Sequence, residues 1–204
     1  MLTALLLLAQ RPTDPPKPTR LPGASIGRPI VALPRVGWMP TISNYTPAQP
    51  EWDPKQAGNG VNAGVLKPEV KKLPYALVAS SKWKSALQTQ GLTVSPGPGK
   101  GWDFKRVQAA GQAAGADYIG MIVLAGAKYG SNPHQSWISL EGVLQVMDVK
   151  TGKIVGDPLL VSGSDTNSPH DSSVKYSATV FKAGQQLGAS SAPSALKTTL
   201  DKLK

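Results

Sequence analysis

Residues 113–155 decide the fold of this chain, because they hold the end of a helix, a buried strand and a hairpin in direct succession. The stretch reads AAGADYIGMIVLAG (residues 113–126), then a short polar loop, then SWISLEGVLQVMDVKTGKIV (residues 136–155). An alanine-rich helix ends at Gly115, and residues 117–124 form a nearly continuous apolar run, typical of a strand covered on both faces. This succession predicts half of a small α/β domain.

The hairpin has the clearest pattern. Residues 136–149 alternate between apolar and polar side chains, as in a strand with one buried face. Gly152 is the turn residue that needs a positive φ. The returning strand, residues 154–162, contains Asp157-Pro158, which predicts a bulge or an edge position because proline has no backbone N–H for the ladder. The residues expected on the buried face are Ile138, Leu140, Leu144 and Val146.

The helix before the buried strand is expected to begin after Asp103, whose carboxylate can accept from the amides of the first turn. Trp102 precedes this cap and can pack on Val107 as a hydrophobic staple. Gly115 ends the helix. Its predicted buried stripe is Phe104, Val107, Gly111 and Ala114.

Other elements are read from shorter patterns. Residues 30–33 predict a first strand, and residues 73–90 predict a helix with Pro74 in its first turn and Gly91 after its end. A short strand is expected at residues 92–94. Two further helices are expected, one around Val174, Ala178 and Phe181, and one from Pro193 with Leu196, Leu200 and Leu203.

The predicted fold class is therefore α/β with a mixed sheet, in the order β-α-β-α-β-β-β-α. We expect one domain over residues 28–190 and a C-terminal helix over residues 191–204. Residues 39–72 contain several prolines and the run GNGVNAG (residues 58–64). They show neither helical nor strand periodicity and predict a long loop.

The N-terminal third is proline-rich. Residues 2–9, LTALLLLA, are too short to span a bilayer as a helix. They match the apolar part of a secretory signal, so we expect a signal segment at residues 1–10, a spacer at residues 11–27, a place outside the cytoplasm and no stable membrane span. A short core segment, or a start that lacks its basic end, is the alternative.

A resemblance to a known module rests on two runs, GADYI (residues 115–119) with the apolar strand after it, and MDVKTGKIV (residues 147–155). Over residues 30–181 the chain resembles the small α/β module of bacterial envelope proteins. These are the curli secretion channel lipoprotein, the lipoprotein activators of penicillin-binding proteins, and the N-terminal domain of the Tol-system propeller protein. The resemblance implies a non-enzymatic scaffold or binding module outside the cytoplasm. The chain has no cysteine for lipidation.

The composition adds a second hypothesis. The chain has 22 Lys and Arg against 12 Asp and Glu, a formal charge of +10, and excess positive charge favours anionic partners. A solvated surface is the alternative, since no run of five basic residues occurs. The residues expected to bind an anionic polymer are Lys71, Lys72, Lys82, Lys84, Lys100, Lys105 and Arg106.

Residues 97–101, GPGKG, join the predicted strand to a helix N-terminus, where backbone amides can hold an anion. The Walker spacing is absent, because Gly101 stands where Ser or Thr should follow Lys100, and Asp103 would repel an anion. A plain turn is the competing interpretation. The residues of the candidate anion site are Gly99, Lys100, Gly101, Lys105 and Arg106.

No catalytic or metal site is predicted. The absence of cysteine rules out thiol chemistry, and His134 and His170 lie in polar loops without metal-ligand spacing. No GxSxG motif or apolar carboxylate pair occurs. We therefore expect no enzyme activity, no cofactor and no metal.

Three tryptophans, Trp38, Trp52 and Trp137, are expected on the surface beside cationic residues. Such an arrangement suits carbohydrate or single-stranded nucleic acid. Alternatively they pin the proline-rich arm onto the domain. The leading hypothesis remains an exported, non-enzymatic module that binds an envelope protein partner, with binding of an anionic polymer (nucleic acid or wall glycan) as the alternative.

Overall fold

The computed structural model describes residues 32–45, 53–70, 72–97, 99–132, 134–167 and 176–203. The predicted signal segment and spacer, Trp52, Lys71, Val174 and His170 lie outside these residues. The elements below all belong to one unit, residues 33–204.

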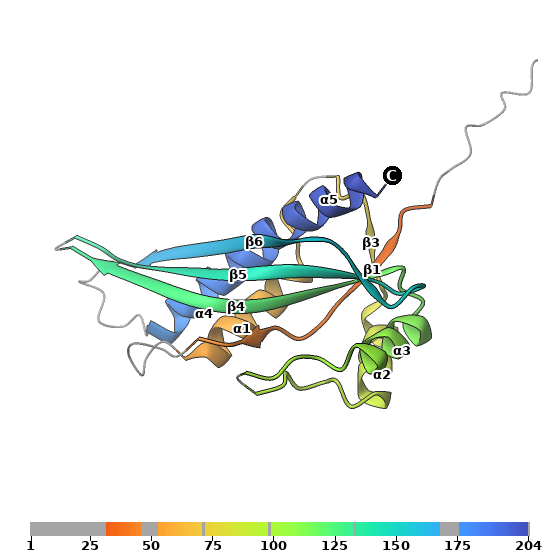
Figure 1. Cartoon of the computed structure of the whole chain (residues 1–204). Coiled ribbons are helices and arrows are strands. Elements are labelled where there is room, and N and C mark those ends of the chain that lie inside the picture. The colour runs from red at the N-terminus through yellow and green to blue at the C-terminus, as the bar shows by residue number, and fades with distance from the viewer. Residues whose placement is uncertain are drawn as a thin grey trace, which may run out of the picture. The chain divides into compact units, whose positions relative to one another are not determined.

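Six strands form one mixed sheet in the order β3-β1-β4-β5-β6, with β2 also paired to β4. The strands β1, β2 and β3 run parallel to their neighbours, and β5 is antiparallel to both β4 and β6 (Figure 1). The predicted α/β class with a mixed sheet is confirmed. The strands are β1 (Arg35–Trp38), β2 (Ile42–Ser43), β3 (Ala76–Leu77), β4 (Tyr118–Ser131), β5 (Ser136–Asp148) and β6 (Lys153–Asn167).

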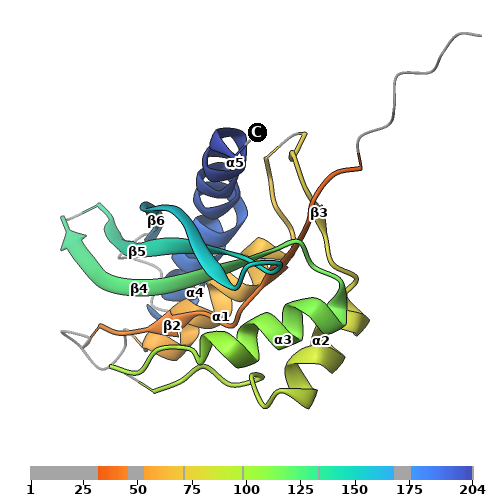
Figure 2. The ribbon, with the colours of Figure 1, turned by 45° about the vertical axis from the view of Figure 1, so that its right-hand side comes forward.

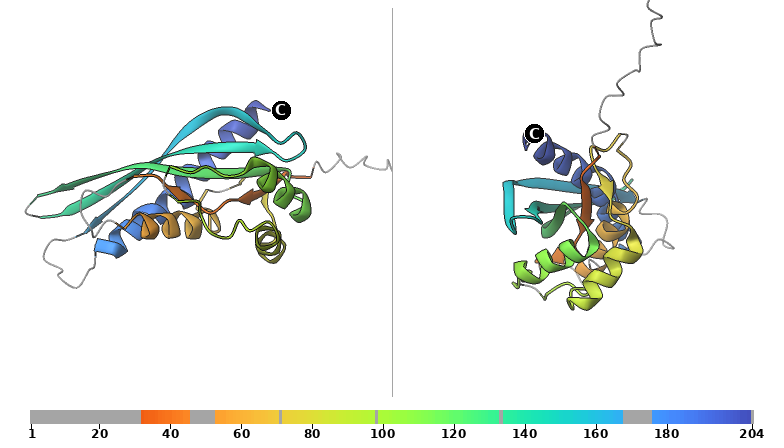
Figure 3. Two further views of the ribbon diagram at one scale, coloured as in Figure 1. Left: turned by 60° about the horizontal axis from the view of Figure 1, so that its bottom comes forward. Right: turned by 90° about the vertical axis from the view of Figure 1, so that its right-hand side faces the viewer.

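The helices form two layers, one on each face of the sheet. The first layer packs on Ile122, Leu140 and Leu144, and the second packs on Ile119, Met121 and Met147. In the left panel of Figure 3, the helices at residues 54–65 and 176–186 lie beneath the strands, and Figure 2 shows the two helices of the second layer side by side. The first layer is α1 (Pro54–Val65), α4 (Tyr176–Gln186), the π-helix η1 (Leu187–Ser191) and α5 (Ala192–Lys202); the second is α2 (Ser80–Thr89) and α3 (Phe104–Ala114).

The predicted hairpin is confirmed. The four apolar residues expected on the buried face of β5 are all buried. Gly152 has φ +68° in the turn. Val155 pairs with Val146 and Leu159 with Leu144, so residues 156–158 bulge opposite a single residue of β5. β6 is also an edge strand. The predicted bulge and the predicted edge position at Asp157-Pro158 are therefore both confirmed.

Side chains of the first helical layer protect the edge of β6. The backbone N–H of Ser162 donates to Ser191 Oγ at 3.0 Å, and that of Ser164 donates to Gln186 Oε1 at 3.1 Å. Free strand edges promote pairing with other chains. The hydroxyl and the amide therefore stabilise the hairpin and occupy donors that another strand would use.

The helix after Asp103 is confirmed as α3. Asp103 Oδ1 accepts from the amides of Lys105 and Arg106, and Gly115 ends the helix with φ +70°. One member of the predicted buried stripe is wrong, since Phe104 is 45% exposed. Phe104 is the first helical residue, and the buried face starts one turn later, at Val107.

Several predicted boundaries are also wrong. The helix expected over residues 73–90 begins only at Ser80, because Ala76 and Leu77 pair with β1 as β3. Residues 92–94 form no strand. Of the strand expected at residues 30–33, residues 30 and 31 lie outside the described residues, residues 32 and 33 form no strand, and β1 begins at Arg35. The two helices expected at the C-terminal end are confirmed as α4 and α5, and Ala178 and Leu203 are exposed there.

The long loop expected over residues 39–72 is wrong in its centre, where α1 occupies residues 54–65. Asp53 caps this helix, with its carboxylate accepting from Lys55 N at 2.8 Å. The glycines of α1 cost helix stability in isolation. Here they let α1 approach the helix α4–η1 at backbone distance: a methyl group on Gly60 would overlap Phe181 O, and one on Gly188 would overlap Val61 O.

Within the described part of the chain, no helix is both long and apolar enough to cross a bilayer.

Candidate functional site

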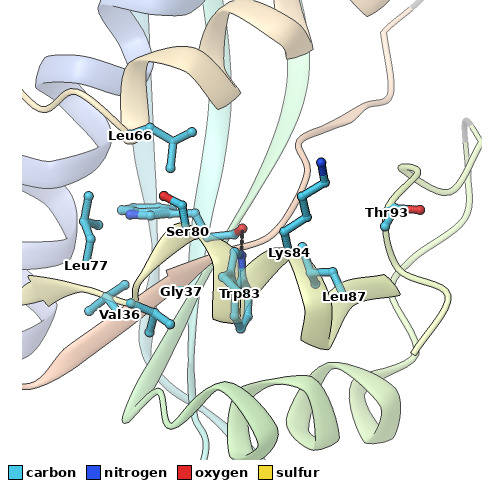
Figure 4. A pocket seen from close by; sticks show the side chains of 11 residues that line it. Val36, Gly37, Leu66, Leu77, Ser80, Trp83, Lys84, Leu87 and Thr93 are labelled. Atoms are coloured by element: carbon cyan, nitrogen blue, oxygen red, sulfur yellow. Dashed lines mark hydrogen bonds between the residues drawn. The ribbon is translucent and has the colours of Figure 1, made fainter. Parts of the chain in front are cut away.

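An apolar pocket of about 330 Å³ lies at the edge of the sheet, between the two helical layers (Figure 4). It forms there because β3 is only two residues long, so it pairs with Arg35 and Val36 but not with the rest of β1. We call it the Trp83 pocket. Its lining residues are Val36, Gly37 and Trp38 of β1, Leu66 after α1, Leu77 and Val78, Ser80, Trp83, Lys84 and Leu87 of α2, and Thr93.

Two tryptophans define the wall of this pocket from opposite faces of the sheet. The ring of Trp83 lies over Gly37, where a methyl group would come within 2.7 Å of the ring. The ring of Trp38 lies over Gly120 on the other face. The indole N–H of Trp83 donates to the carbonyl oxygen of Trp38 at 2.7 Å, which fixes the position of the Trp83 ring.

The polar groups of the Trp83 pocket are few. Ser80, Thr93 and the ammonium group of Lys84 are exposed, and Lys84 has no ion pair with any described residue. Trp38 is 6% exposed, and its own indole N–H has no partner among the described residues. Buried donors nearly always have a partner, so this buried N–H is unusual.

A second candidate surface is the side of β4, β5 and β6 that faces away from α1 and α4. The second helical layer covers it near Ile119 and Met147, but the far ends of the strands extend away from β1 (Figure 1). We call this uncovered part the open face. Val123, Val143 and Leu160 are paired across the three strands there, and Leu160 is 86% exposed.

The open face carries little net charge. Lys128 and Glu141 form an ion pair across β4 and β5. Serines 139, 162 and 164 fill the neighbouring positions of β5 and β6. An apolar row bordered by small polar side chains is suited to contact with a protein surface.

The aromatic residues expected on the surface do not form one site. The prediction is wrong for Trp38, which is buried because its ring packs over Gly120. Trp137 does lie on the open face, where its ring covers Gly130 of the neighbouring strand. Trp52 lies outside the described residues. Among the described tryptophans, only Trp137 therefore supports the hypothesis that surface aromatics bind carbohydrate or nucleic acid.

Several backbone amides of the predicted anion site already donate hydrogen bonds within the protein. The amides of Lys105 and Arg106 both donate to Asp103, and the amide of Gly99 donates to Asn44 Oδ1 at 3.2 Å. Lys100 and Gly101 are exposed. Anion binding by these five residues stays a prediction.

Among the described residues, the titratable groups form no evident reaction centre. His134 is exposed, and no group of three or more His, Asp or Glu side chains in the described ranges could hold a metal ion. Tyr118, Asp117 and Asp148 are among the residues that line one polar hollow. Burial, together with the carboxylates of Asp148 and Asp117, raises the pKa of Tyr118, which keeps its hydroxyl protonated and unreactive.

Comparison with known proteins gives structural likeness only. No protein-family model matches the sequence, and no curated protein matches it. The chain is similar to the crystal structure of lipoprotein GNA1162 from Neisseria meningitidis, at 11% identity and a TM-score of 0.45, over 83% of this chain and 99% of that one. It is also similar to the hypothetical protein CT253 from Chlamydia trachomatis, at 11% identity and a TM-score of 0.44, over 83% of this chain and 98% of that one.

A third similar structure is the C-terminal domain of LpoB from Escherichia coli, at 18% identity and a TM-score of 0.37, over 69% of this chain and 87% of that one. Bacterial lipoproteins are thus among the structural neighbours, as the resemblance named from the sequence implied. At these identities and scores, the likeness does not tell what this chain binds.

The sequence pattern missed both candidate surfaces. The Trp83 pocket is lined by residues between 36 and 93 at an edge of the sheet. The periodicity of the sequence does not show that β3 ends after two residues, which is why the pocket could not be predicted. A signal for the open face was present, since Leu160 stands at an outward position of an edge strand, but alternation alone does not tell which faces helices cover.

Proposed function

We propose that this chain is a non-enzymatic binding module of the bacterial cell envelope and that it acts through contacts between the open face and a partner protein. The observation that carries the proposal is the apolar row of Val123, Val143 and Leu160 on a part of the sheet with no described helix over it. A place outside the cytoplasm is supported by the apolar run at residues 2–9 and the proline-rich sequence after it.

The chemistry of the open face indicates the kind of partner. Leu160 gains little from folding because it stays in water, and removing such a side chain from water stabilises a complex by about 25 cal/mol per Å² of apolar area. The Lys128–Glu141 pair neutralises itself. The partner surface is therefore apolar and near neutral, rather than strongly acidic.

Site-specific photo-cross-linking in the producing bacterium tests this proposal. A photoreactive amino acid at position 160 should give a cross-linked product of defined mass, whose protein partner is identified and then purified. The dissociation constant of the purified pair should rise at least tenfold for Leu160→Asp.

The matched control is Val94→Asp, because Val94 is 78% exposed but lies in the loop after α2. Val94→Asp should change the dissociation constant by less than twofold. Equal effects of the two substitutions, or cross-links from position 94 to the same partner in equal yield, would sink the proposal.

A second candidate function is binding of an anionic polymer, nucleic acid or wall glycan, through the second helical layer. Residues 71–116 contain seven of the 22 basic residues and one of the 12 acidic residues, Asp103. α2 and α3 contact each other, so their exposed cations share one layer: Lys82, Lys84, Lys105 and Arg106.

The test of this second function is the salt dependence of binding to heparin and to DNA. Neutralising polymer charges releases counterions, so affinity falls steeply with added salt. The double substitution Lys82→Glu with Lys105→Glu should abolish retention at low salt. Retention that is insensitive to salt, or unchanged in the double variant, excludes this function.

A further inference from the structure

We infer that the Trp83 pocket is a binding site for a single-chain amphiphile with an anionic head group, of the chemical class of a fatty acid. The hydrocarbon chain lies along the apolar wall, and the head group meets the ammonium of Lys84. This site is separate from the open face and does not depend on the proposed partner.

The size and lining of the pocket favour a hydrocarbon chain. Small-molecule sites usually enclose about 300–1,000 Å³, and this pocket, at about 330 Å³, is at the lower end of that range. One acyl chain is therefore a better match than a two-chain lipid. Apolar contacts come from every element around it, including Val36, Leu77, Trp83 and Leu87.

The described lining of the Trp83 pocket carries one positive charge, which lies at one end of the pocket. Lys84 is the sole ionisable residue among the described lining residues, and no described carboxylate pairs with it. In Figure 4, Lys84 and Thr93 stand at one end of the pocket, and Leu77 and Val36 stand at the other. An amphiphile with its head at Lys84 would thus direct its chain towards Leu77.

The backbone around the pocket argues against a peptide as the occupant. A peptide strand that joined β1 would need free carbonyl groups on the strand edge. The carbonyl of Val36 already accepts from Val78 N at 3.0 Å, and that of Trp38 accepts from the Trp83 indole. The edge therefore offers apolar side chains without free backbone acceptors at these two positions.

Calorimetric titration of the full chain with dodecanoate, below its critical micelle concentration, tests the inference. Wild-type protein should bind one dodecanoate per chain in a saturable manner. Ser80→Phe places a ring at the mouth of the pocket and should weaken binding at least tenfold. Ser80 is an exposed first residue of α2, so the substitution should leave the unfolding midpoint unchanged.

Charge reversal at the head-group position provides the second arm. Lys84→Glu should weaken dodecanoate binding at least tenfold and strengthen binding of dodecyltrimethylammonium. The control is Lys82→Glu, the same charge change on the same helix outside the pocket, with less than a twofold effect. Leu160→Asp should also leave dodecanoate binding unchanged, which separates this site from the open face.

Three results would each overturn the inference. They are no saturable one-to-one binding by the wild type, unchanged binding in a folded Ser80→Phe variant, and an effect of Lys84→Glu no larger than that of Lys82→Glu.

Discussion

The indole N–H of Trp83 donates a hydrogen bond of 2.7 Å to the backbone carbonyl of Trp38, 45 residues earlier in the chain. The bond joins α2 to β1 at the point where β3 has ended, so a side chain completes the edge that a strand leaves unpaired. The ring of Trp38 packs on the opposite face, where its own N–H has no described partner. The two tryptophans are alike in burial and opposite in hydrogen bonding.

This difference predicts unequal costs of two identical substitutions. Trp83→Phe leaves the buried carbonyl of Trp38 without its donor, which costs about 1–3 kcal/mol in addition to the lost ring area. Trp38→Phe removes a donor that has no partner. Urea unfolding should therefore show Trp83→Phe to be less stable than Trp38→Phe by at least about 1 kcal/mol. Equal midpoints would show that the hydrogen bond contributes nothing.

The close contact between α1 and the α4–η1 helix predicts that adding a methyl group destabilises the fold. In an isolated helix, Gly60→Ala would be favourable by about 1 kcal/mol. In this structure the new methyl group overlaps Phe181 O, and overpacking of this kind costs about 1–3 kcal/mol. We expect a net loss of stability in thermal and urea unfolding.

Gly101→Ala is the control for that prediction. A methyl group there has no described atom within 4 Å, and Gly101 has no positive φ. Its effect should stay within about 0.5 kcal/mol. If Gly60→Ala is as stable as Gly101→Ala, α1 and α4 are not as close as described.

The open face predicts a substitution that spares stability. Leu160→Ser alters a side chain that is 86% exposed, so the free energy of unfolding should change by less than about 0.5 kcal/mol. Leu140 lies in the same sheet but faces the first helical layer and is buried. Leu140→Ser should therefore cost several kcal/mol, because a core leucine is lost and a hydroxyl is buried. Similar losses for both would mean that a part of this protein covers Leu160.

Alkaline pH should destabilise the fold through Tyr45. Burial, together with the carboxylate of Asp53, raises the pKa of Tyr45 from 10.0 to about 12. In the unfolded chain this phenol ionises near pH 10. The stabilisation is therefore complete below about pH 10 and is lost as the pH rises towards 12, because the unfolded state releases a proton that the folded state keeps.

Urea midpoints measured between pH 9 and pH 11.5 check this prediction. Tyr45→Phe should flatten their decline, at little cost at pH 7, because the Tyr45 hydroxyl is buried without a described partner. Burial also raises the pKa of Tyr75, so some decline should remain. A decline of the same slope in Tyr45→Phe would exclude Tyr45 as its source.

Local chemistry predicted α3 and the β5–β6 hairpin well. Asp103 and Gly115 are capping residues whose effect does not depend on distant contacts, and Gly152 supplies the positive φ that the turn requires. Of the two described tryptophans that the sequence placed on the surface, Trp137 is exposed and Trp38 is buried. The sequence placed Trp38 there wrongly, because the space for its ring comes from Gly120, 82 positions later.

The sequence by itself determined the elements whose signals are local: the capped helix α3, the continuous apolar strand β4 and the alternating hairpin. Only the tertiary structure decided that the glycine-rich residues 58–64 are helical, because the contact of α1 with α4–η1 offsets their poor helix propensity. It also decided where β3 stops and which sheet face lacks a helix. The end of β3 and the uncovered sheet face both depend on contacts between segments that are distant in the sequence. The Trp83 pocket and the open face therefore could not be predicted from any single segment.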